Sequence, residues 1–159
     1  MLIDCSTWCV AILNVVGWPI IQVGLGWTFT RMPARWFEPP RPMRWESEGR
    51  IYERFLRVRR WKDRLPDGAQ WFEGGFAKAR LDSTAPEYLR RFLLETWRGE
   101  LCHWSALAFA PVFALWNPPW AVAVMTFCGL LLNLPCIVVL RFNRARFYAL
   151  VGRRVTRAS

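Results

Sequence analysis

The chain has 159 residues, which fits one domain, and it combines 53% hydrophobic residues with a formal net charge of +10. All 22 basic residues lie in two blocks, from Arg31 to Arg98 and from Arg141 to Arg157, and these blocks flank uncharged apolar runs. This segregation argues against a nucleic-acid binder, which would spread its basic patch over a soluble fold, and it indicates a membrane protein.

The first apolar run covers residues 8–29, carries no charge and exceeds the roughly 20 residues that a helix needs to span a bilayer. Pro19 lies inside it and predicts a kink. A cleaved signal peptide is the alternative, but the residues before the run include Asp4 and no basic residue, the reverse of a positive leader. Because the next segment is basic, we expect the N-terminus outside and that segment inside.

Residues 31–100 are predicted to form a basic cytoplasmic segment. Its first part, residues 31–45, is rich in proline and arginine, which predicts an extended stretch on the lipid headgroups. Residues 46–61 place apolar and basic side chains on separate helical faces, which predicts an amphipathic helix in the membrane plane. Turn signals follow at residues 66–68 and 74–75. Thr84 and Glu87 then fit a capping box, with Pro86 in the first turn of a long helix.

Two further spans are predicted at residues 101–117 and 120–140, followed by a basic tail at 141–159. The apolar part of the first is about 24 Å long as a helix, short of the hydrocarbon core of about 30 Å. Either the bilayer thins around it, or His103 lies slightly inside the apolar zone, or the segment dips without fully crossing. Three spans would place the N-terminus outside and the C-terminus in the cytoplasm. We therefore expect an all-α, multi-pass protein of the cell (inner) membrane, with amphipathic helices at its cytoplasmic face.

Residues 95–104 lead from the basic segment into the apolar one and hold the only histidine, His103. Glu100 precedes His103 by three residues and shares its helical face, so it could orient the ring while the imidazole acts as a general base. The alternative is an interfacial histidine that packs and makes one hydrogen bond. Glu95 and Arg98 have the same spacing and are interpreted first as a salt bridge.

Other polar groups lie near the predicted membrane surface. Arginine clusters at residues 59–63 and 141–146 suit phosphates of lipid headgroups or of a nucleotide-bearing donor, although juxtamembrane cytoplasmic segments are commonly basic. Asn133 lies inside a predicted span, where its amide needs a partner, either another helix or a ligand. The cysteines show no metal-ligand spacing, so we expect no metal site.

Four short motifs lie along the chain. They are Arg-Trp-Lys-Asp at 60–63, Glu-Thr-Trp-Arg-Gly-Glu-Leu-Cys-His-Trp at 95–104, Asn-Leu-Pro-Cys-Ile at 133–137 and Arg-Phe-Asn-Arg-Ala-Arg at 141–146. In order and spacing they resemble the glycosyl-4,4'-diaponeurosporenoate acyltransferases over about residues 30–147. The chain departs from that pattern at Leu140, where glutamine is expected, and the loop at 66–80 matches poorly.

The resemblance implies an O-acyltransferase that esterifies a sugar hydroxyl of a carotenoid glycoside or related glycolipid with a fatty acyl group. The catalytic candidates are His103, Glu100 and Glu95. The substrate-binding candidates are Arg98, Arg60, Trp61, Lys62, Asp63, Asn133, Arg141, Asn143 and Arg144.

We expect no bound cofactor, and an acyl donor such as acyl-CoA or a similar carrier. The expected partners are membrane lipids, a lipidic glycoside acceptor and further membrane proteins, but no nucleic acid. The competing hypothesis is a non-catalytic membrane subunit that packs in a larger complex or binds lipid or carotenoid.

Overall fold

The computed structural model describes residues 3, 6–65, 83 and 85–158, and every regular element within this part of the chain is helical. The α-helices are α1 (Thr7–Arg31), α2 (Arg50–Leu56), α3 (Pro86–Ala108) and α4 (Pro119–Ala158). Short 3-10 helices connect them: η1 (Ala34–Trp36), η2 (Arg44–Gly49), η3 (Val58–Arg60), η4 (Lys62–Arg64) and η6 (Ala110–Leu115). For these residues the all-α prediction is confirmed.

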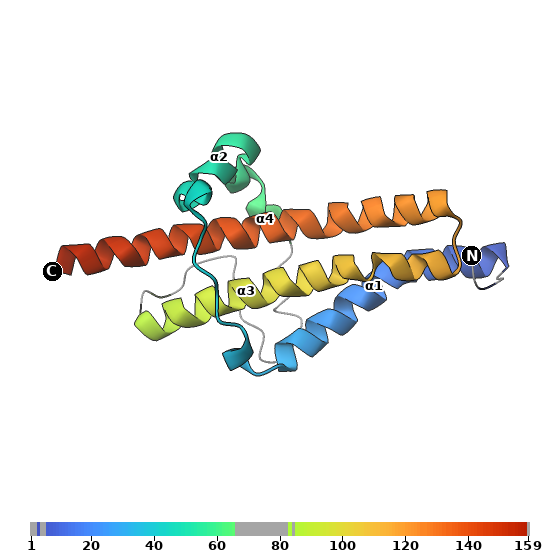
Figure 1. Ribbon diagram of the computed structural model, residues 1–159, viewed down its shortest axis with the longest axis horizontal. Coiled ribbons are helices and arrows are strands. Elements are labelled where there is room, and N and C mark those ends of the chain that lie inside the picture. The colour runs from blue at the N-terminus through green and yellow to red at the C-terminus, as the bar shows by residue number, and fades with distance from the viewer. Residues whose placement is uncertain (1–2, 4–5, 66–82, 84, 159) are drawn as a thin grey trace.

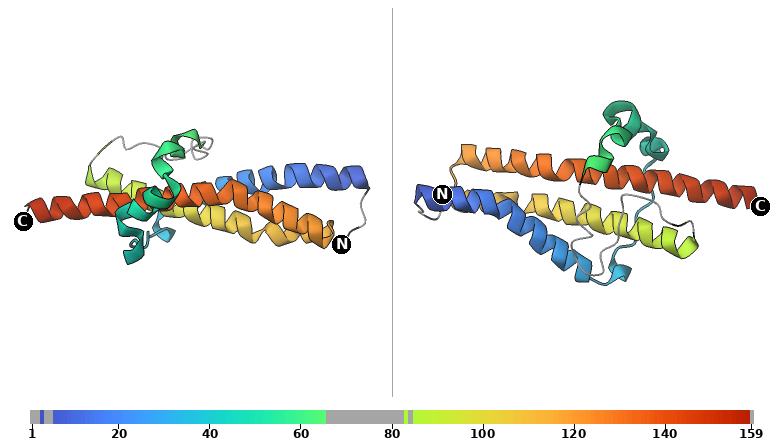
Figure 2. Two further views of the ribbon diagram at one scale, coloured as in Figure 1. Left: turned by 90° about the horizontal axis from the view of Figure 1, so that it is seen from above. Right: turned by 180° about the vertical axis from the view of Figure 1, so that it is seen from behind.

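Helices α3 and α4 form a long antiparallel hairpin, and α1 lies along its apolar half (Figure 1). The start of α1 lies beside the hairpin turn, while the C-terminus lies at the opposite end of the molecule (Figures 1 and 2). The backbone N–H of Ile3 donates to the carbonyl of Leu115, with 2.9 Å between the atoms. The apolar segments therefore share one half of the molecule, and the basic segments share the other.

Two helices are long and apolar enough to cross a membrane, α1 and the part of α4 from Pro119 to Leu150. Their large apolar side chains mostly point outward, as Trp8, Trp120 and Leu131 do with 81%, 72% and 60% of their surfaces exposed. Contiguous exposed apolar surface is rare on soluble monomers and typical of a lipid-facing one. The finding supports two spans.

The predicted third span, residues 101–117, is not one regular helix, so a count of three is not confirmed. Helix α3 ends at Ala108, and η6 completes the segment. Pro111 explains the break, because it has no N–H for an α-helical bond and disfavours helical geometry in the residue before it. The next prolines, Pro118 and Pro119, lie just before the last predicted span, and α4 indeed begins at Pro119.

Helix α1 is joined to the rest of the bundle by polar side chains spaced four residues apart. The amides of Asn14 and Asn117 donate to each other at 2.9 and 2.8 Å. One turn on, the indole N–H of Trp18 donates to the carbonyl of Met125 at 3.0 Å. Gly129 makes room for that ring, since a Cβ there would lie 2.2 Å from it. The two helices thus interlock through polar contacts and one small residue, a packing mode common among membrane helices.

The predicted amphipathic helix at residues 46–61 is much shorter in the structure, where only α2 is α-helical. Gly49 before it and Arg57 after it have φ values of +85° and +48°, in the left-handed region, which interrupts a right-handed helix on both sides. The turn before α2 closes around the buried carboxylate of Glu46, which accepts from the Met43 N–H at 2.6 Å and from the Tyr52 hydroxyl at 2.5 Å.

The start of α3 agrees with the prediction only in part. Pro86 lies at the first helical position, as expected, but Ala85 is the N-cap and makes no side-chain capping bond. Thr84 and the predicted turns at residues 66–68 and 74–75 lie outside the described residues. At the other end of the molecule, α4 does not stop at residue 140 but carries the basic residues onward as helix.

Candidate functional site

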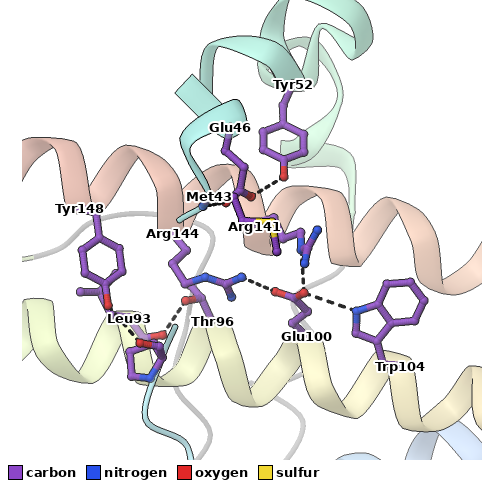
Figure 3. A network of polar contacts seen from close by, with 11 residues as sticks. Met43, Glu46, Tyr52, Leu93, Thr96, Glu100, Trp104, Arg141, Arg144 and Tyr148 are labelled. Atoms are coloured by element: carbon purple, nitrogen blue, oxygen red, sulfur yellow. Dashed lines mark hydrogen bonds and ion pairs between the residues drawn. The ribbon is translucent and has the colours of Figure 1, made fainter. Parts of the chain in front are cut away.

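A buried carboxylate lies at the centre of the α3–α4 interface. Glu100 is fully buried, and its Oε1 lies 2.7 Å from Nε of Arg141, while its Oε2 lies 2.6 Å from Nη2 of Arg144 (Figure 3). The indole N–H of Trp104 donates to the same Oε1 at a longer 3.4 Å. Arg141 and Arg144 are one turn apart on α4, so both guanidinium groups reach the same carboxylate.

The cluster of Glu100, Arg141 and Arg144 contains two positive charges and one negative charge, so one positive charge remains without a counterion within it. Arg144 is 3% exposed, and its guanidinium also lies over the ring of Trp97, 5.1 Å from the centroid. Its Nη1 is buried and has no hydrogen-bond partner among the described residues. A buried guanidinium with a remaining donor favours an oxyanion or carbonyl oxygen at this position.

Glu95 and Arg98 form the salt bridge that their spacing predicts, with 2.9 Å between Oε1 and Nη1. Arg98 also donates to the carbonyl of Met32 at 3.3 Å and lies over the ring of Phe37, 4.8 Å from its centroid. The pair is buried, and its contacts join α3 to the segment that follows α1. Its role in substrate binding or catalysis remains a prediction.

His103 lies where α1, α3 and α4 meet. Its Nδ1 is 2.8 Å from the side-chain oxygen of Asn133, which is completely buried. The same oxygen accepts from the Gln22 amide at 2.7 Å, and the Asn133 amide nitrogen donates to the carbonyl of Gly129 at 2.9 Å. One asparagine on α4 therefore holds a glutamine from α1 and the histidine from α3.

These bonds define the tautomer of the His103 ring. The Asn133 nitrogen donates to a carbonyl, so the atom that faces His103 is the amide oxygen, which can only accept. Nδ1 must therefore carry the hydrogen, and in the neutral ring Nε2 carries the lone pair. A ring held in this way can accept a proton at Nε2.

In the structure Glu100 contacts arginines of α4 and does not hold Nδ1 of His103. We predicted that it orients the imidazole, but both of its oxygens are engaged by arginines of α4, and the hydrogen bond that holds Nδ1 comes from Asn133. Spacing on one helix could not show this, because both partners come from a different helix.

The motif at residues 60–63 packs against α4 from the short helices η3 and η4. Trp61 lies against the cluster of Tyr52, Val58 and Phe142, and its indole N–H donates to the carbonyl of Leu56 at 2.8 Å. Of the other three members, Arg60 and Asp63 are exposed, while Lys62 is partly buried and pairs with Asp63 at 2.7 Å. The motif is thus brought to the same stretch of α4 that holds Arg141, Asn143 and Arg144.

Gln22 was not predicted as a site residue from the sequence. It lies in α1, which carries no charge before Arg31, four residues after Trp18 and eight after Asn14, and all three side chains point at the other helices. That spacing was the available signal, because polar side chains recurring on one face of an apolar helix indicate an interface with other helices.

Known proteins resemble the chain over most of its length. The model of the glycosyl-4,4'-diaponeurosporenoate acyltransferase family matches residues 33–153. Curated proteins of that name from the Newman and COL strains of Staphylococcus aureus are each 27% identical to it over 139 residues, which cover 84% of this chain and 83% of theirs. No solved structure is significantly similar to it.

Proposed function

The chain belongs to the glycosyl-4,4'-diaponeurosporenoate acyltransferase family, and from this premise we propose that it is a membrane enzyme that transfers a fatty acyl group to a sugar hydroxyl. The acceptor would be a carotenoid glycoside or a related glycolipid, and the donor an acyl-CoA or a similar thioester. The observation that carries the proposal is the hydrogen bond from His103 Nδ1 to Asn133, which leaves the lone pair on Nε2.

The reaction needs a base and a group that stabilises negative charge. The sugar hydroxyl loses its proton to Nε2 of His103 as its oxygen attacks the acyl carbonyl carbon. The tetrahedral intermediate then collapses, the carbon–sulfur bond breaks, and the proton passes from the imidazolium to the leaving thiolate. Ester and thiol are the products, so the step consumes no other reactant.

The arginines of α4 are the candidates for the charged part of this reaction. Arg144 has a buried donor, Nη1, without a partner in the described part of the chain, and Arg141 is 28% exposed at its side chain while bound to Glu100. Donors held in a low-dielectric setting before the reaction begins are effective at stabilising an oxyanion. In this role Glu100 would fix the two guanidinium groups and would not act on His103.

The proposed enzyme also requires a particular arrangement of the apolar segments in the membrane. The start of α1 lies beside the turn between η6 and α4, so the three apolar segments run side by side with their ends together (Figure 1). We propose that residues 101–116 lie within the bilayer between the two longer spans, with the N-terminus outside and the C-terminus in the cytoplasm. A lipidic glycoside in the inner leaflet would then reach His103 near the cytoplasmic surface.

The test is ester formation by membranes that contain the full chain, supplied with glycosyl-4,4'-diaponeurosporenoate and a fatty acyl-CoA and analysed by mass spectrometry. We expect His103→Ala to lower the rate by about a hundredfold or more, because general bases contribute that much. Ser105→Ala, two residues along the same helix, is the matched control and should keep the wild-type rate. Wild-type turnover by His103→Ala, at equal amounts of protein, would refute the assignment.

One observation favours the alternative of a non-catalytic subunit. The buried charges Glu95, Arg98, Glu100 and Arg144 largely pair with one another, as they would in a scaffold. If so, purified wild-type protein would form no ester with any acyl donor, and a stoichiometric membrane partner would co-purify with it.

A further inference from the structure

A pocket of about 300 Å³ lies between α2 and α4, outside the His103 and Glu100 sites. Its floor is made by Phe142 and Gly49, which are buried, and four arginines and two glutamates surround it. The arginines are Arg50, Arg54, Arg59 and Arg146, and the glutamates are Glu48 and Glu53. This volume is at the lower limit for ligand pockets, which suits one compact charged group and not a whole lipid.

The sequence positions these arginines through backbone geometry. Gly49 has a φ of +85°, and a Cβ there would lie 2.9 Å from Cγ of Arg146, so only glycine lets the chain approach α4 this closely. The guanidinium of Arg146 lies over the Phe142 ring, 5.4 Å from the centroid. Arg146 is thereby held against the pocket floor and is not extended into solvent.

The carboxylates do not cancel the positive charge of the pocket. Glu53 accepts from the backbone N–H of Arg59 at 3.1 Å, so its carboxylate holds the turn at which α2 ends. Arg50 is oriented by a bond from its Nε to the carbonyl of Ser47 at 3.3 Å. Four guanidinium groups against two carboxylates leave the lining of the pocket with a net positive charge, which suits an anion.

We propose that this pocket binds a phosphate or diphosphate group. Guanidinium forks match phosphate oxygens in pairs, and four arginines line this pocket around the buried Phe142 ring. Two sources supply such a group at a membrane surface: the headgroup of an anionic phospholipid, or the nucleotide end of an acyl-CoA. For the second source the inference rests on the proposed function, because the phosphates would anchor the acyl donor.

The distance to His103 is compatible with that second source. Arg146 lies 13 residues after Asn133 on α4, which is about 20 Å along the helix axis. Coenzyme A carries its phosphates at one end and its thiol at the end of a long flexible arm. A donor with its phosphates in the pocket could therefore place its thioester toward the membrane-facing part of α4.

Binding to the full chain in nanodiscs tests the proposal with two probes. Coenzyme A is titrated by calorimetry in discs of phosphatidylcholine, and retained phosphatidylglycerol is counted by native mass spectrometry after reconstitution in an equal mixture of the two lipids. The double variant Arg59→Gln/Arg146→Gln should lose about tenfold or more in binding of the relevant probe. Arg35→Gln, an exposed arginine of η1 away from the pocket, is the control.

Each outcome has a definite meaning. Coenzyme A bound by wild type, by Arg35→Gln and by His103→Ala, but not by the double variant, identifies the pocket with the donor even if His103 is not the base. Phosphatidylglycerol retained in the same pattern, without coenzyme A binding, identifies a headgroup site. On the wild-type protein, inorganic pyrophosphate should displace whichever probe binds. Equal binding by the double variant and Arg35→Gln, no binding of either probe, or no displacement by pyrophosphate would overturn the proposal.

Discussion

Glu100 and Arg144 face each other across the α3–α4 interface, with 2.6 Å between Oε2 and Nη2 and only 1% and 4% of their side chains exposed. Arg141 contacts the other carboxylate oxygen. Because breaking a buried ion pair leaves an uncompensated charge, Glu100→Gln should lower the free energy of unfolding by about 3–5 kcal/mol.

Thermal unfolding of the purified protein in detergent measures this loss. Glu38→Gln is the control, since Glu38 is exposed and its replacement should change stability by less than about 0.5 kcal/mol. If Glu100→Gln unfolds at the wild-type temperature, the two arginines must have another counterion.

The His103 tautomer can be observed directly, because the chain contains a single histidine. Nitrogen-15 NMR of histidine-labelled protein should show one imidazole with hydrogen on Nδ1 and a lone pair on Nε2, as the bond to Asn133 requires. In Asn133→Leu the preference for Nδ1–H should disappear. A wild-type spectrum with hydrogen on Nε2 would contradict the arrangement and weaken the case for a base.

Two glycines, one on α4 and one on α1, provide a matched pair of substitutions. A Cβ at Gly129 would lie 2.2 Å from the Trp18 ring, so Gly129→Ala should force the helices apart and cost about 1–3 kcal/mol. A Cβ at Gly24 would meet no described residue within 4 Å, and Gly24→Ala should be neutral or stabilise by up to about 1 kcal/mol. Equal unfolding temperatures for both variants would mean that α1 does not pack on α4 as described.

The Tyr52–Glu46 bond should make stability depend on alkaline pH. Burial, and then the bond to Glu46, raise the pKa of Tyr52 above its usual value near 10. The folded state thus retains the proton more tightly than the unfolded chain does. The contribution is complete below about pH 10 and falls as the pH rises from the unfolded-state pKa through the folded-state one.

Tyr52→Phe should therefore be less stable than wild type by about 1–3 kcal/mol at neutral pH, because Glu46 loses a donor while buried. The difference should shrink as the pH is raised above about 10. Chemical unfolding of both proteins at several pH values measures it. A difference that stays constant through this range would show that the hydroxyl contributes nothing through its proton.

The features that could be predicted from the sequence are those that depend on residues close together along the chain. Long apolar runs located α1 and α4, and the i,i+3 spacing located the Glu95–Arg98 pair, because both depend on the geometry of one helix. The limits of α2 could not be read in this way, since Arg57 adopts a left-handed conformation that its residue type does not favour.

The candidate site was predictable as a set of residues but not as a set of contacts. Asn133 was noticed because an amide in an apolar helix needs a partner, yet its partners Gln22 and His103 lie 111 and 30 residues away. The two arginines that bind Glu100 were likewise assigned to substrate. Only the antiparallel pairing of α3 and α4 shows that they first serve the carboxylate.

The position of residues 101–116 in the bilayer makes the last prediction. In the structure the start of α1 and the turn after η6 lie together, while η4 belongs to the basic half of the molecule. In a cysteine-free background we expect Ser6→Cys and Pro118→Cys to react with an impermeant maleimide from outside intact cells. Arg64→Cys should react only after permeabilisation. If Pro118→Cys instead behaves like Arg64→Cys, the segment does not cross, and α1 and the hairpin turn must separate in the membrane.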